Sequence, residues 1–184
     1  MRIITGRAKG LRLKTPAGLN TRPTSDRVKE SLFSILSGLI DLSEVCAVLD
    51  VFAGTGALGL EAISRGAASA TFIDAATTEI IRDNLTRAKF EGCKILRGDF
   101  AKVLARLGKQ GLMFDLIFAD PPYAKGFAQA TLKLIAELNL ASGLIVIEHG
   151  AEEILDVPTN FELIRKVTYG HTTAIEIFER KLLT

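Results

Sequence analysis

DVFAGTGALGLE, residues 50–61, is the most informative stretch of this sequence. Its glycines Gly54, Gly56 and Gly59 follow the pattern GxGxxG, between an apolar run typical of a buried strand and a segment of helical character. Glycine permits a tight turn and lets a ligand come close to the backbone. We therefore predict a strand–loop–helix unit that holds a nucleotide-containing ligand.

Outside this stretch, short apolar runs alternate with helical segments. The expected strands are 47–52, 69–74, 93–99, 113–120 and 143–149, and the expected helices are 57–65, 77–90, 100–107 and 127–138. Such alternation predicts a parallel sheet covered by helices on both faces. Residues 161–169 and 174–180 instead predict an antiparallel hairpin at one edge. The expected fold is thus α/β, a Rossmann-like and mostly parallel seven-stranded sheet with a C-terminal hairpin.

The N-terminal part has a different character. We expect a small β-hairpin from residues 2–4 and 11–14, then a helix that begins near Thr24, so that 1–44 forms an extension and 45–184 the main domain. Residues 1–30 carry a net charge of +6 and the remainder −4. A basic arm on an acidic body favours a polyanionic partner such as nucleic acid. The alternative is a solvated hairpin whose charges keep an edge strand soluble.

The composition of the chain is that of a globular protein. The chain has 184 residues, of which 48% are hydrophobic and 24% charged, which is typical of one globular domain. No apolar run approaches the roughly 18 residues that cross a membrane, and the basic N-terminus lacks a signal peptide's apolar core. Cys46 and Cys93, with two histidines, offer no metal-ligand spacing, and we expect both cysteines to be buried. We predict a cytoplasmic, monomeric protein without a metal.

Acidic residues close or follow the first four strands. They are Asp50, Asp74, Asp99 and Asp120, separated by 24, 25 and 21 residues. Right-handed crossovers bring the carboxyl ends of parallel strands to one edge, where ligands bind. Four carboxylates there suit a ligand rich in hydroxyls and amines, or a cation. Alternatively, each aspartate caps the helix that follows it.

The first of these acids, Asp50, argues against a dinucleotide. A pyrophosphate at the glycine loop would be repelled by this carboxylate, whereas S-adenosylmethionine (AdoMet) is cationic and has no phosphate. Asp74 would accept the ribose hydroxyls and Asp99 the adenine amine, with Phe100 against the adenine ring. The predicted cofactor-binding residues are Asp50, Phe52, Ala53, Gly54, Gly56, Asp74, Asp99, Phe100 and Thr24.

The fourth strand is followed by Asp120-Pro121-Pro122-Tyr123, DPPY. Two prolines give a stiff turn with acceptor carbonyls and no N–H donors. Asp120 and the Pro121 carbonyl can accept both N–H groups of an exocyclic amine, and Tyr123 can stack on its base. We predict an in-line methyl transfer driven by positioning, with these four residues catalytic and no histidine base. The alternative is that Pro-Pro merely ends the strand and Asp120 caps a helix.

These motifs resemble a known family. DVFAGTGALGLEA followed by DPPY is similar to amino-methyltransferases, and MRIITGRAKGLRLKTP, RPTSDRVKESLFSIL and LEAISRGA resemble bacterial 16S ribosomal RNA guanine-N2 methyltransferases of the RsmD type over essentially the whole chain. The resemblance implies a class I methyltransferase that uses AdoMet to methylate one guanine N2 in the assembled or partly assembled small ribosomal subunit. Asp74 stands where the family usually has glutamate, which affects the expected cofactor affinity.

The resemblance also gives the basic arm a role, because RNA binding depends on phosphate contacts from Lys and Arg. The predicted RNA-binding residues are Arg7, Lys9, Arg12, Lys14 and Arg22. The segment Arg22-Pro23-Thr24 is expected beside the cofactor pocket or the incoming nucleotide. Other interpretations are an amino-methyltransferase for DNA adenine or protein glutamine, an NAD-dependent oxidoreductase, and a non-enzymatic ribosome-assembly factor.

Overall fold

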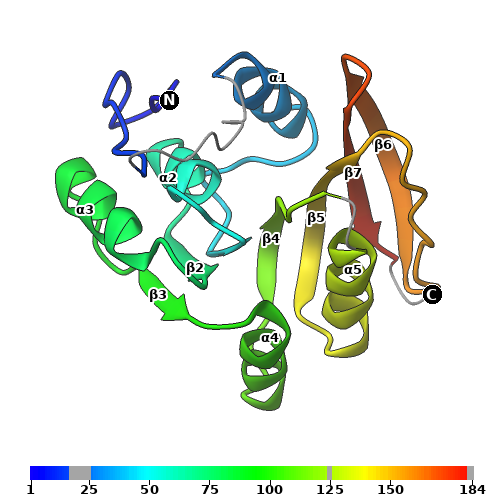
Figure 1. The fold of residues 1–184 in the computed structure, drawn as a ribbon. Helices are drawn as coiled ribbons and strands as arrows, with labels where there is room; N and C mark the ends of the chain where they lie inside the picture. Colours follow the sequence, from blue (N-terminus) through cyan, green and yellow to red (C-terminus); the bar gives the residue numbers. More distant parts are fainter. Residues whose placement is uncertain (17–25, 124–125, 182–184) are drawn as a thin grey trace.

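Seven strands form one mixed sheet in the computed structural model, which describes residues 1–16, 26–123 and 126–181 (Figure 1). The strands are β1 (Ala47–Val51), β2 (Ser69–Asp74), β3 (Lys94–Arg97), β4 (Phe114–Ala119), β5 (Ala141–Gly150), β6 (Phe161–Tyr169) and β7 (Thr173–Arg180). Their order across the sheet is β3-β2-β1-β4-β5-β7-β6. Neighbouring strands from β3 to β5 are parallel, and β7 is antiparallel to both β5 and β6. The predicted α/β fold with a C-terminal antiparallel hairpin is confirmed.

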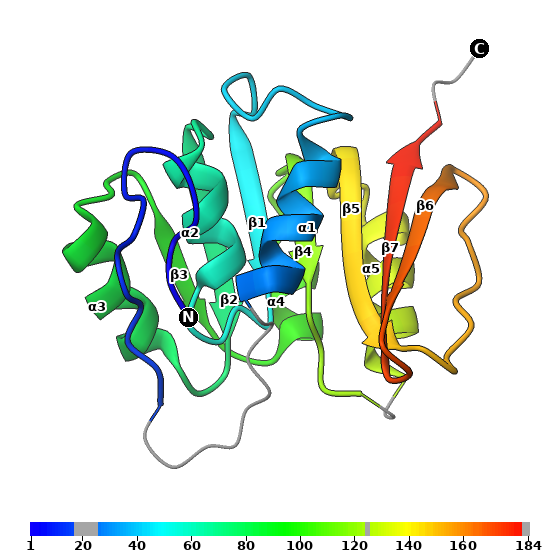
Figure 2. The ribbon, with the colours of Figure 1, turned by 90° about the horizontal axis from the view of Figure 1, so that it is seen from above.

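Helices cover both faces of the sheet (Figure 2). They are α1 (Asp26–Leu36), α2 (Ala57–Ser64), α3 (Thr78–Ala88), α4 (Phe100–Lys109) and α5 (Phe127–Glu137). Apolar side chains of α1, α2 and α3 pack with Val48 and Phe118 on one face, and those of α4 and α5 pack with Leu49 and Ile117 on the other. Because successive strand residues point to opposite faces, the near-continuous apolar strands feed both cores. No described helix has the length and apolar character needed to cross a membrane.

The sheet has its topological switch between β1 and β4. From β1 the chain continues to β2 and β3 on one side, whereas β4 and β5 extend on the other. In open α/β sheets the crevice at such a switch point is where ligands bind. The same crevice receives the glycine loop after β1 and the DPPY turn after β4, so the topology joins the two motifs.

Two details differ from the sequence-based expectation. The N-terminal hairpin is reduced to a single antiparallel bridge between Arg2 and Arg12, although Ile3 and Leu13 are buried. The expected burial of both cysteines is wrong, because Cys46 is exposed and Cys93 is half-buried. Cys46 directly precedes β1, where its backbone N–H donates to the carboxylate of Asp115 while the side chain faces solvent.

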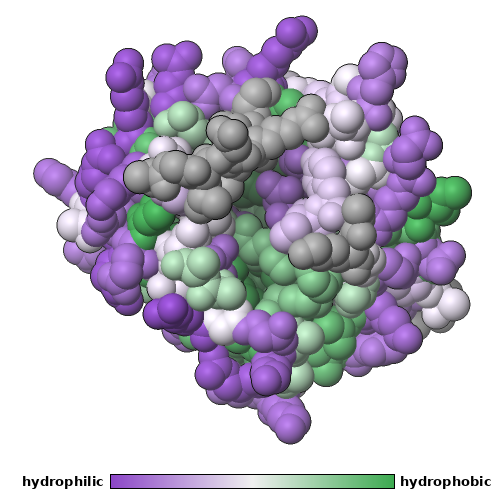
Figure 3. All heavy atoms as spheres, viewed as in Figure 1, coloured by the Kyte–Doolittle hydropathy of each residue, from purple (hydrophilic) through white to green (hydrophobic). Residues whose placement is uncertain are grey.

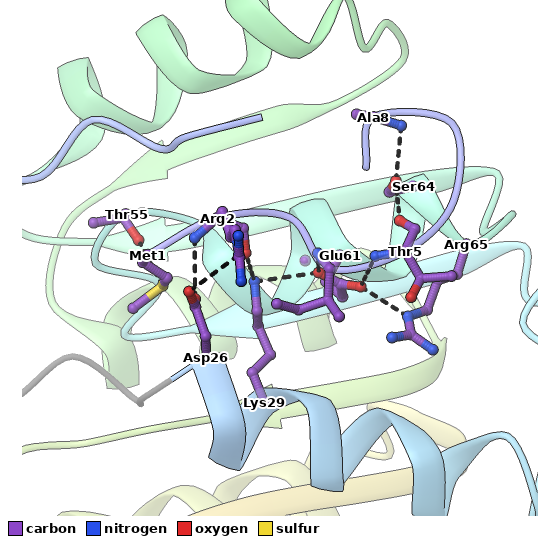
Figure 4. A network of polar contacts seen from close by, with 12 residues as sticks. Met1, Arg2, Thr5, Ala8, Asp26, Lys29, Thr55, Glu61, Ser64 and Arg65 are labelled. Carbon is purple, nitrogen blue, oxygen red and sulfur yellow. Dashed lines mark hydrogen bonds and ion pairs between the residues drawn. The ribbon is translucent and has the colours of Figure 1, made fainter. Parts of the chain in front are cut away.

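A buried carboxylate joins the N-terminal segment to two helices (Figure 4). Glu61 of α2 accepts hydrogen bonds from the backbone N–H groups of Ile4 (2.7 Å) and Thr5 (3.0 Å). It also forms ion pairs with Lys29 of α1 (3.2 Å) and with Arg65 (2.9 Å). The side chains of Glu61 and Lys29 are both fully buried. The two ends of the first 30 residues are therefore tied to α2 through one side chain.

Lys29 completes this network. Its ammonium group donates to the carbonyl of Arg2, and burial lowers the pKa of Lys29 against the opposing effect of Glu61. Nearby, Gly6 lies so close to α2 that a Cβ there would be 1.7 Å from the carbonyl oxygen of Ser64. The N-terminal segment is thus part of the main hydrophobic core and is held close against α2.

We expect Glu61→Gln to lower the free energy of unfolding by about 3 kcal/mol, because it leaves the buried Lys29 ammonium without its counter-charge. Urea denaturation measures this loss. Glu79→Gln is the control, since the Glu79–Arg82 pair is exposed and its removal should change stability little. An unfolding free energy of Glu61→Gln equal to that of the wild type would show that the network does not hold the segment.

Candidate functional site

A pocket of about 910 Å³ lies at the carboxyl ends of β1, β2, β4 and β5. The glycine loop and the DPPY turn line it, together with Met1, Thr15 and Pro16 from the N-terminal segment and Val28 from α1. In Figure 3 apolar surface (green) lies near the centre of the face seen in Figure 1, and hydrophilic side chains (purple) surround it. The predicted position at the carboxyl edge of the sheet agrees with this pocket.

The glycine loop uses each of its glycines for a structural reason. Gly54 and Gly56 have positive φ angles of 57° and 78°, which side-chain-bearing residues rarely adopt. At Gly59 an added Cβ would be 2.5 Å from the ring of Phe72, so α2 could not pack this closely on the sheet. Phe52, Ala53 and Gly54 line the pocket. Gly56 does not line it and contributes only to the conformation of the turn.

Asp50 lies inside β1, with its side chain buried beneath the loop. Its Oδ2 accepts a hydrogen bond from the backbone N–H of Gly59 at 2.9 Å, and the residue also lines the pocket. Burial raises the pKa of Asp50 to about 7, the Gly59 hydrogen bond opposes this shift, and the nearby Asp74 adds to it. The pocket therefore has a carboxylate at its base that a cationic ligand would stabilise.

Asp74, at the end of β2, organises the rim of the pocket. One carboxylate oxygen accepts from the N–H of Gly54 at 2.9 Å, and the other accepts from the N–H groups of Ala76 and Thr77, both at 2.8 Å. Asp74 thus holds the glycine loop and the start of α3 while it lines the pocket. Each carboxylate oxygen can accept more than one hydrogen bond, so the predicted contact with a ribose remains sterically compatible.

Asp99 and Phe100 are placed differently from the other predicted residues. Asp99 is the N-cap of α4 and accepts from the N–H of Lys102 at 3.1 Å, which is the capping role considered as the alternative. The ring of Phe100 packs against Phe52 and Phe127, with centroids 4.8 and 5.6 Å apart. Neither Asp99 nor Phe100 lines the pocket, but Phe52 connects this aromatic cluster to it. Their contact with an adenine stays a prediction.

The DPPY turn forms the opposite wall. Asp120, Pro121, Pro122 and Tyr123 all line the pocket. The Tyr123 hydroxyl donates to Oε1 of Glu148 at 2.6 Å, and Thr173 Oγ1 lies 3.1 Å from the same hydroxyl. Burial, followed by the hydrogen bond to Glu148, raises the pKa of Tyr123, so that it remains protonated and acts as a donor. The tyrosine ring is thereby fixed against the end of β5.

Three residues that were not predicted from the sequence as site residues are Glu148, Thr173 and Tyr169. All three line the pocket. Glu148 had the same signal as the other acids, because it lies near the end of an apolar strand that is parallel to β4. Thr173 and Tyr169 belong to the C-terminal hairpin, whose position beside β5 could not be read from local sequence.

The charged side chains in the described lining of the pocket are all acidic. Among the described residues that line it, Asp50, Asp74, Asp120 and Glu148 are acidic and none is Lys, Arg or His. Such a pocket repels phosphate and accepts hydrogen bonds from hydroxyls and amines. It therefore fits AdoMet, with its sulfonium, amino group, ribose hydroxyls and adenine amine, better than it fits a dinucleotide.

The predicted RNA-binding side chains lie on the N-terminal segment. Arg7, Lys9, Arg12 and Lys14 are all exposed. The guanidinium of Arg7 stacks over the ring of Phe90 at 4.6 Å, and Lys14 pairs with Asp83 of α3. These contacts place Arg7 and Lys14 beside α3 and the residues that follow it.

Two predicted site residues, Arg22 and Thr24, lie outside the described residues, as does the neighbouring Pro23. Within the parts of the chain that are described, no group of three or more His, Cys, Asp or Glu side chains is arranged to hold a metal ion.

Comparisons with known proteins show that this chain is similar to methyltransferases. The family model "Conserved hypothetical protein 95" matches residues 1–178. The chain is 36% identical to "Ribosomal RNA small subunit methyltransferase D" of Escherichia coli, over 98% of this chain and 90% of that protein. It is also 36% identical to "Putative rRNA methyltransferase YlbH" of Bacillus subtilis, over 98% of this chain and all of that protein.

Solved structures with a similar fold are also described as methyltransferases. "Putative methyltransferase yhhF" from Escherichia coli superposes with a TM-score of 0.86 at 34% identity, covering 98% of both chains. The fold also occurs in SMU.776, a methyltransferase by its description, solved in complex with S-adenosylhomocysteine. There the TM-score is 0.66 at 16% identity, over 83% of this chain and 48% of that one.

The buried Asp50 predicts a pH-dependent stability. Its pKa is raised from 3.8 to about 7 on folding, so between these pH values the folded protein binds a proton that the unfolded chain lacks. The contribution of Asp50 to stability therefore falls as the pH rises through this window. We expect Asp50→Asn to raise the melting temperature at pH 8 but hardly at pH 4, because the amide still accepts from Gly59. A difference between variant and wild type that does not change with pH would contradict this.

Proposed function

Because the chain belongs to the RsmD family of methyltransferases, whose model covers residues 1–178, we propose that it methylates the exocyclic N2 of one guanine in 16S ribosomal RNA. The methyl donor of this enzyme is S-adenosylmethionine. The substrate would be the small ribosomal subunit, assembled or partly assembled, in the cytoplasm.

One observation supports the proposal most strongly, namely the acid-lined pocket between the glycine loop and the DPPY turn. In this pocket Asp50 would lower the energy of a cationic ligand, and Asp74 would accept from ribose hydroxyls while it keeps Gly54 in place. When bound, AdoMet supplies an electrophilic methyl group on a positively charged sulfur. Phe52 and Leu58 line the same space, and their apolar side chains would exclude water once the ligands are bound.

The DPPY turn would prepare the amine. Asp120 and the Pro121 carbonyl accept its two N–H groups, which directs the nitrogen lone pair toward the methyl group. An exocyclic amine need not lose a proton before it attacks, so the site requires no strong base. As the bond from nitrogen to the methyl carbon forms, the bond from that carbon to sulfur would break and S-adenosylhomocysteine would leave, and the Asp120 carboxylate would accept the proton that the methylated nitrogen then releases. Holding the two reactants in line and away from water accounts for the rate increase. Tyr123, fixed by Glu148, offers a ring face on which the base can stack.

The N-terminal segment would bind the RNA. Its exposed arginines and lysines contact phosphates, and the target guanine leaves its stack to reach the pocket. The segment also contributes Met1, Thr15 and Pro16 to the pocket, which connects RNA binding to the catalytic site.

Transfer of labelled methyl from AdoMet to unmodified small ribosomal subunits tests the proposal, with free 16S RNA and DNA in parallel. The expected product is N2-methylguanosine at a single position, identified by mass spectrometry of the nucleosides. Methylation of DNA or of protein instead would show that the methyl acceptor is another amine and not guanine N2. Absence of transfer to every acceptor, with AdoMet bound, would favour a non-enzymatic role in subunit assembly.

We expect Asp120→Ala to reduce methyl transfer by at least about 1,000-fold, which corresponds to roughly 4 kcal/mol for an interaction made in the transition state. The dissociation constant for AdoMet, measured by calorimetry, should stay within about threefold, because Asp50 and Asp74 hold the cofactor. Normal product formation by this variant would contradict the catalytic assignment.

Reversing two charges of the arm, Lys9→Glu with Arg12→Glu, should weaken RNA binding by at least about tenfold and lower the slope of log K against log[salt] by about 2. AdoMet affinity should not change. The control is Arg106→Glu with Lys109→Glu, which makes the same charge change in the last turn of α4, on the other face of the sheet. Equal effects of the two double variants would show that the arm has no special role.

A further inference from the structure

Glu148 and Asp120 lie next to each other at the end of two neighbouring strands. Ala119 of β4 pairs with Ile147 of β5, so the next residues of the two strands, Asp120 and Glu148, occupy adjacent positions. Neighbouring strands are about 4.8 Å apart. Both residues line the pocket, and Tyr123 contacts Glu148 directly. The wall that receives the base therefore has two carboxylates side by side, rather than the single acid of the DPPY turn.

The orientation of Glu148 is fixed by a chain of hydroxyl groups. Tyr123 donates its phenolic proton to Oε1 of Glu148. A phenol has one proton, so Thr173, 3.1 Å from the Tyr123 oxygen, acts as the donor in the second contact. Glu148 is half-buried, and its backbone belongs to the central part of the sheet. This carboxylate is therefore a preorganised acceptor in the pocket, since a carboxylate can accept up to about four hydrogen bonds.

Two adjacent carboxylates match the edge of one base only. Guanine carries a ring N1–H next to its N2 amine, so it presents donors at both positions. Adenine and cytosine place a ring nitrogen lone pair beside their amine, and uracil has no amine. With the amine at Asp120, a carboxylate at Glu148 accepts a hydrogen bond from guanine N1–H but would face the lone pair of adenine or cytosine.

We propose that Glu148 is the specificity-determining residue of this site, and that it selects guanine by accepting its N1–H while Asp120 and Pro121 hold the N2 amine. This inference rests on the proposed function. It assigns Tyr123 a second task, to orient Glu148 through its hydroxyl. Sites that hydrogen-bond a substrate group reject analogues that lack it strongly, because the site's own polar group is then left without a partner.

The test compares guanine with 2-aminopurine, which keeps the N2 amine but has a lone pair at N1. Small subunits are reconstituted with 16S RNA that carries either base at the position methylated by the wild type. We expect the wild type to prefer guanine by at least 100-fold in kcat/KM. Glu148→Gln should lower this preference at least tenfold, since its amide can donate to the N1 of 2-aminopurine.

Two further variants are compared with Glu148→Gln. Tyr123→Phe removes the hydroxyl that orients Glu148, so the preference for guanine should fall, but by less than in Glu148→Gln, because the carboxylate remains and no amide can donate to N1 of 2-aminopurine. Glu152→Gln removes an exposed carboxylate just after β5 and should change neither rate. AdoMet binding and thermal melting confirm that each variant is folded.

A purely structural role of Glu148 predicts equal losses on both bases. Equal losses in Glu148→Gln, complete loss included, would therefore overturn the inference while the proposed function stands. If the wild type forms no N2-methylguanosine at all, the proposed function itself fails. A selective gain for 2-aminopurine supports both.

Discussion

The buried carboxylate of Glu61 is the interaction on which the arrangement of this molecule depends. A fully buried charge is stable only with paired charges and hydrogen bonds around it, and Glu61 finds these in the backbone of Ile4 and Thr5, in Lys29 and in Arg65. The requirement brings the N-terminal segment and α1 against α2. As a consequence Met1, Thr15 and Val28 reach the pocket, although they are far in sequence from the loops that form its base.

The pocket follows a second electrostatic constraint. Three of its four carboxylates are held by different means: Asp50 by the N–H of Gly59, Asp74 by three backbone N–H groups, and Glu148 by the Tyr123 hydroxyl. None of these three relies on a lysine or arginine in the pocket lining. The described lining of the pocket therefore has acidic side chains and no Lys, Arg or His, which suits a positively charged cofactor and the amine of a base. The basic arm outside the pocket provides the opposite charge for the RNA backbone.

Much of the architecture was predictable because its signals are local. The central strands are short apolar runs and most helices have periodic apolar positions, so the α/β fold and the C-terminal hairpin could be inferred. Asp50, Asp74 and Asp120 meet in one pocket because parallel strands end at the same edge. Asp99 was placed by the same rule but caps α4, since that helix begins immediately after it and its first N–H groups need an acceptor.

The amino-acid sequence by itself determined the type of fold, the edge of the sheet that carries the site, and the chemistry of that edge. These follow from periodicity, glycine spacing and the acids after buried strands. Only the tertiary structure decided that Glu148 joins Tyr123 and Thr173 at the DPPY turn, and that Glu61 secures a segment 56 residues away in sequence. Such contacts connect distant parts of the chain, and no local pattern specifies which polar groups will become partners once they are buried.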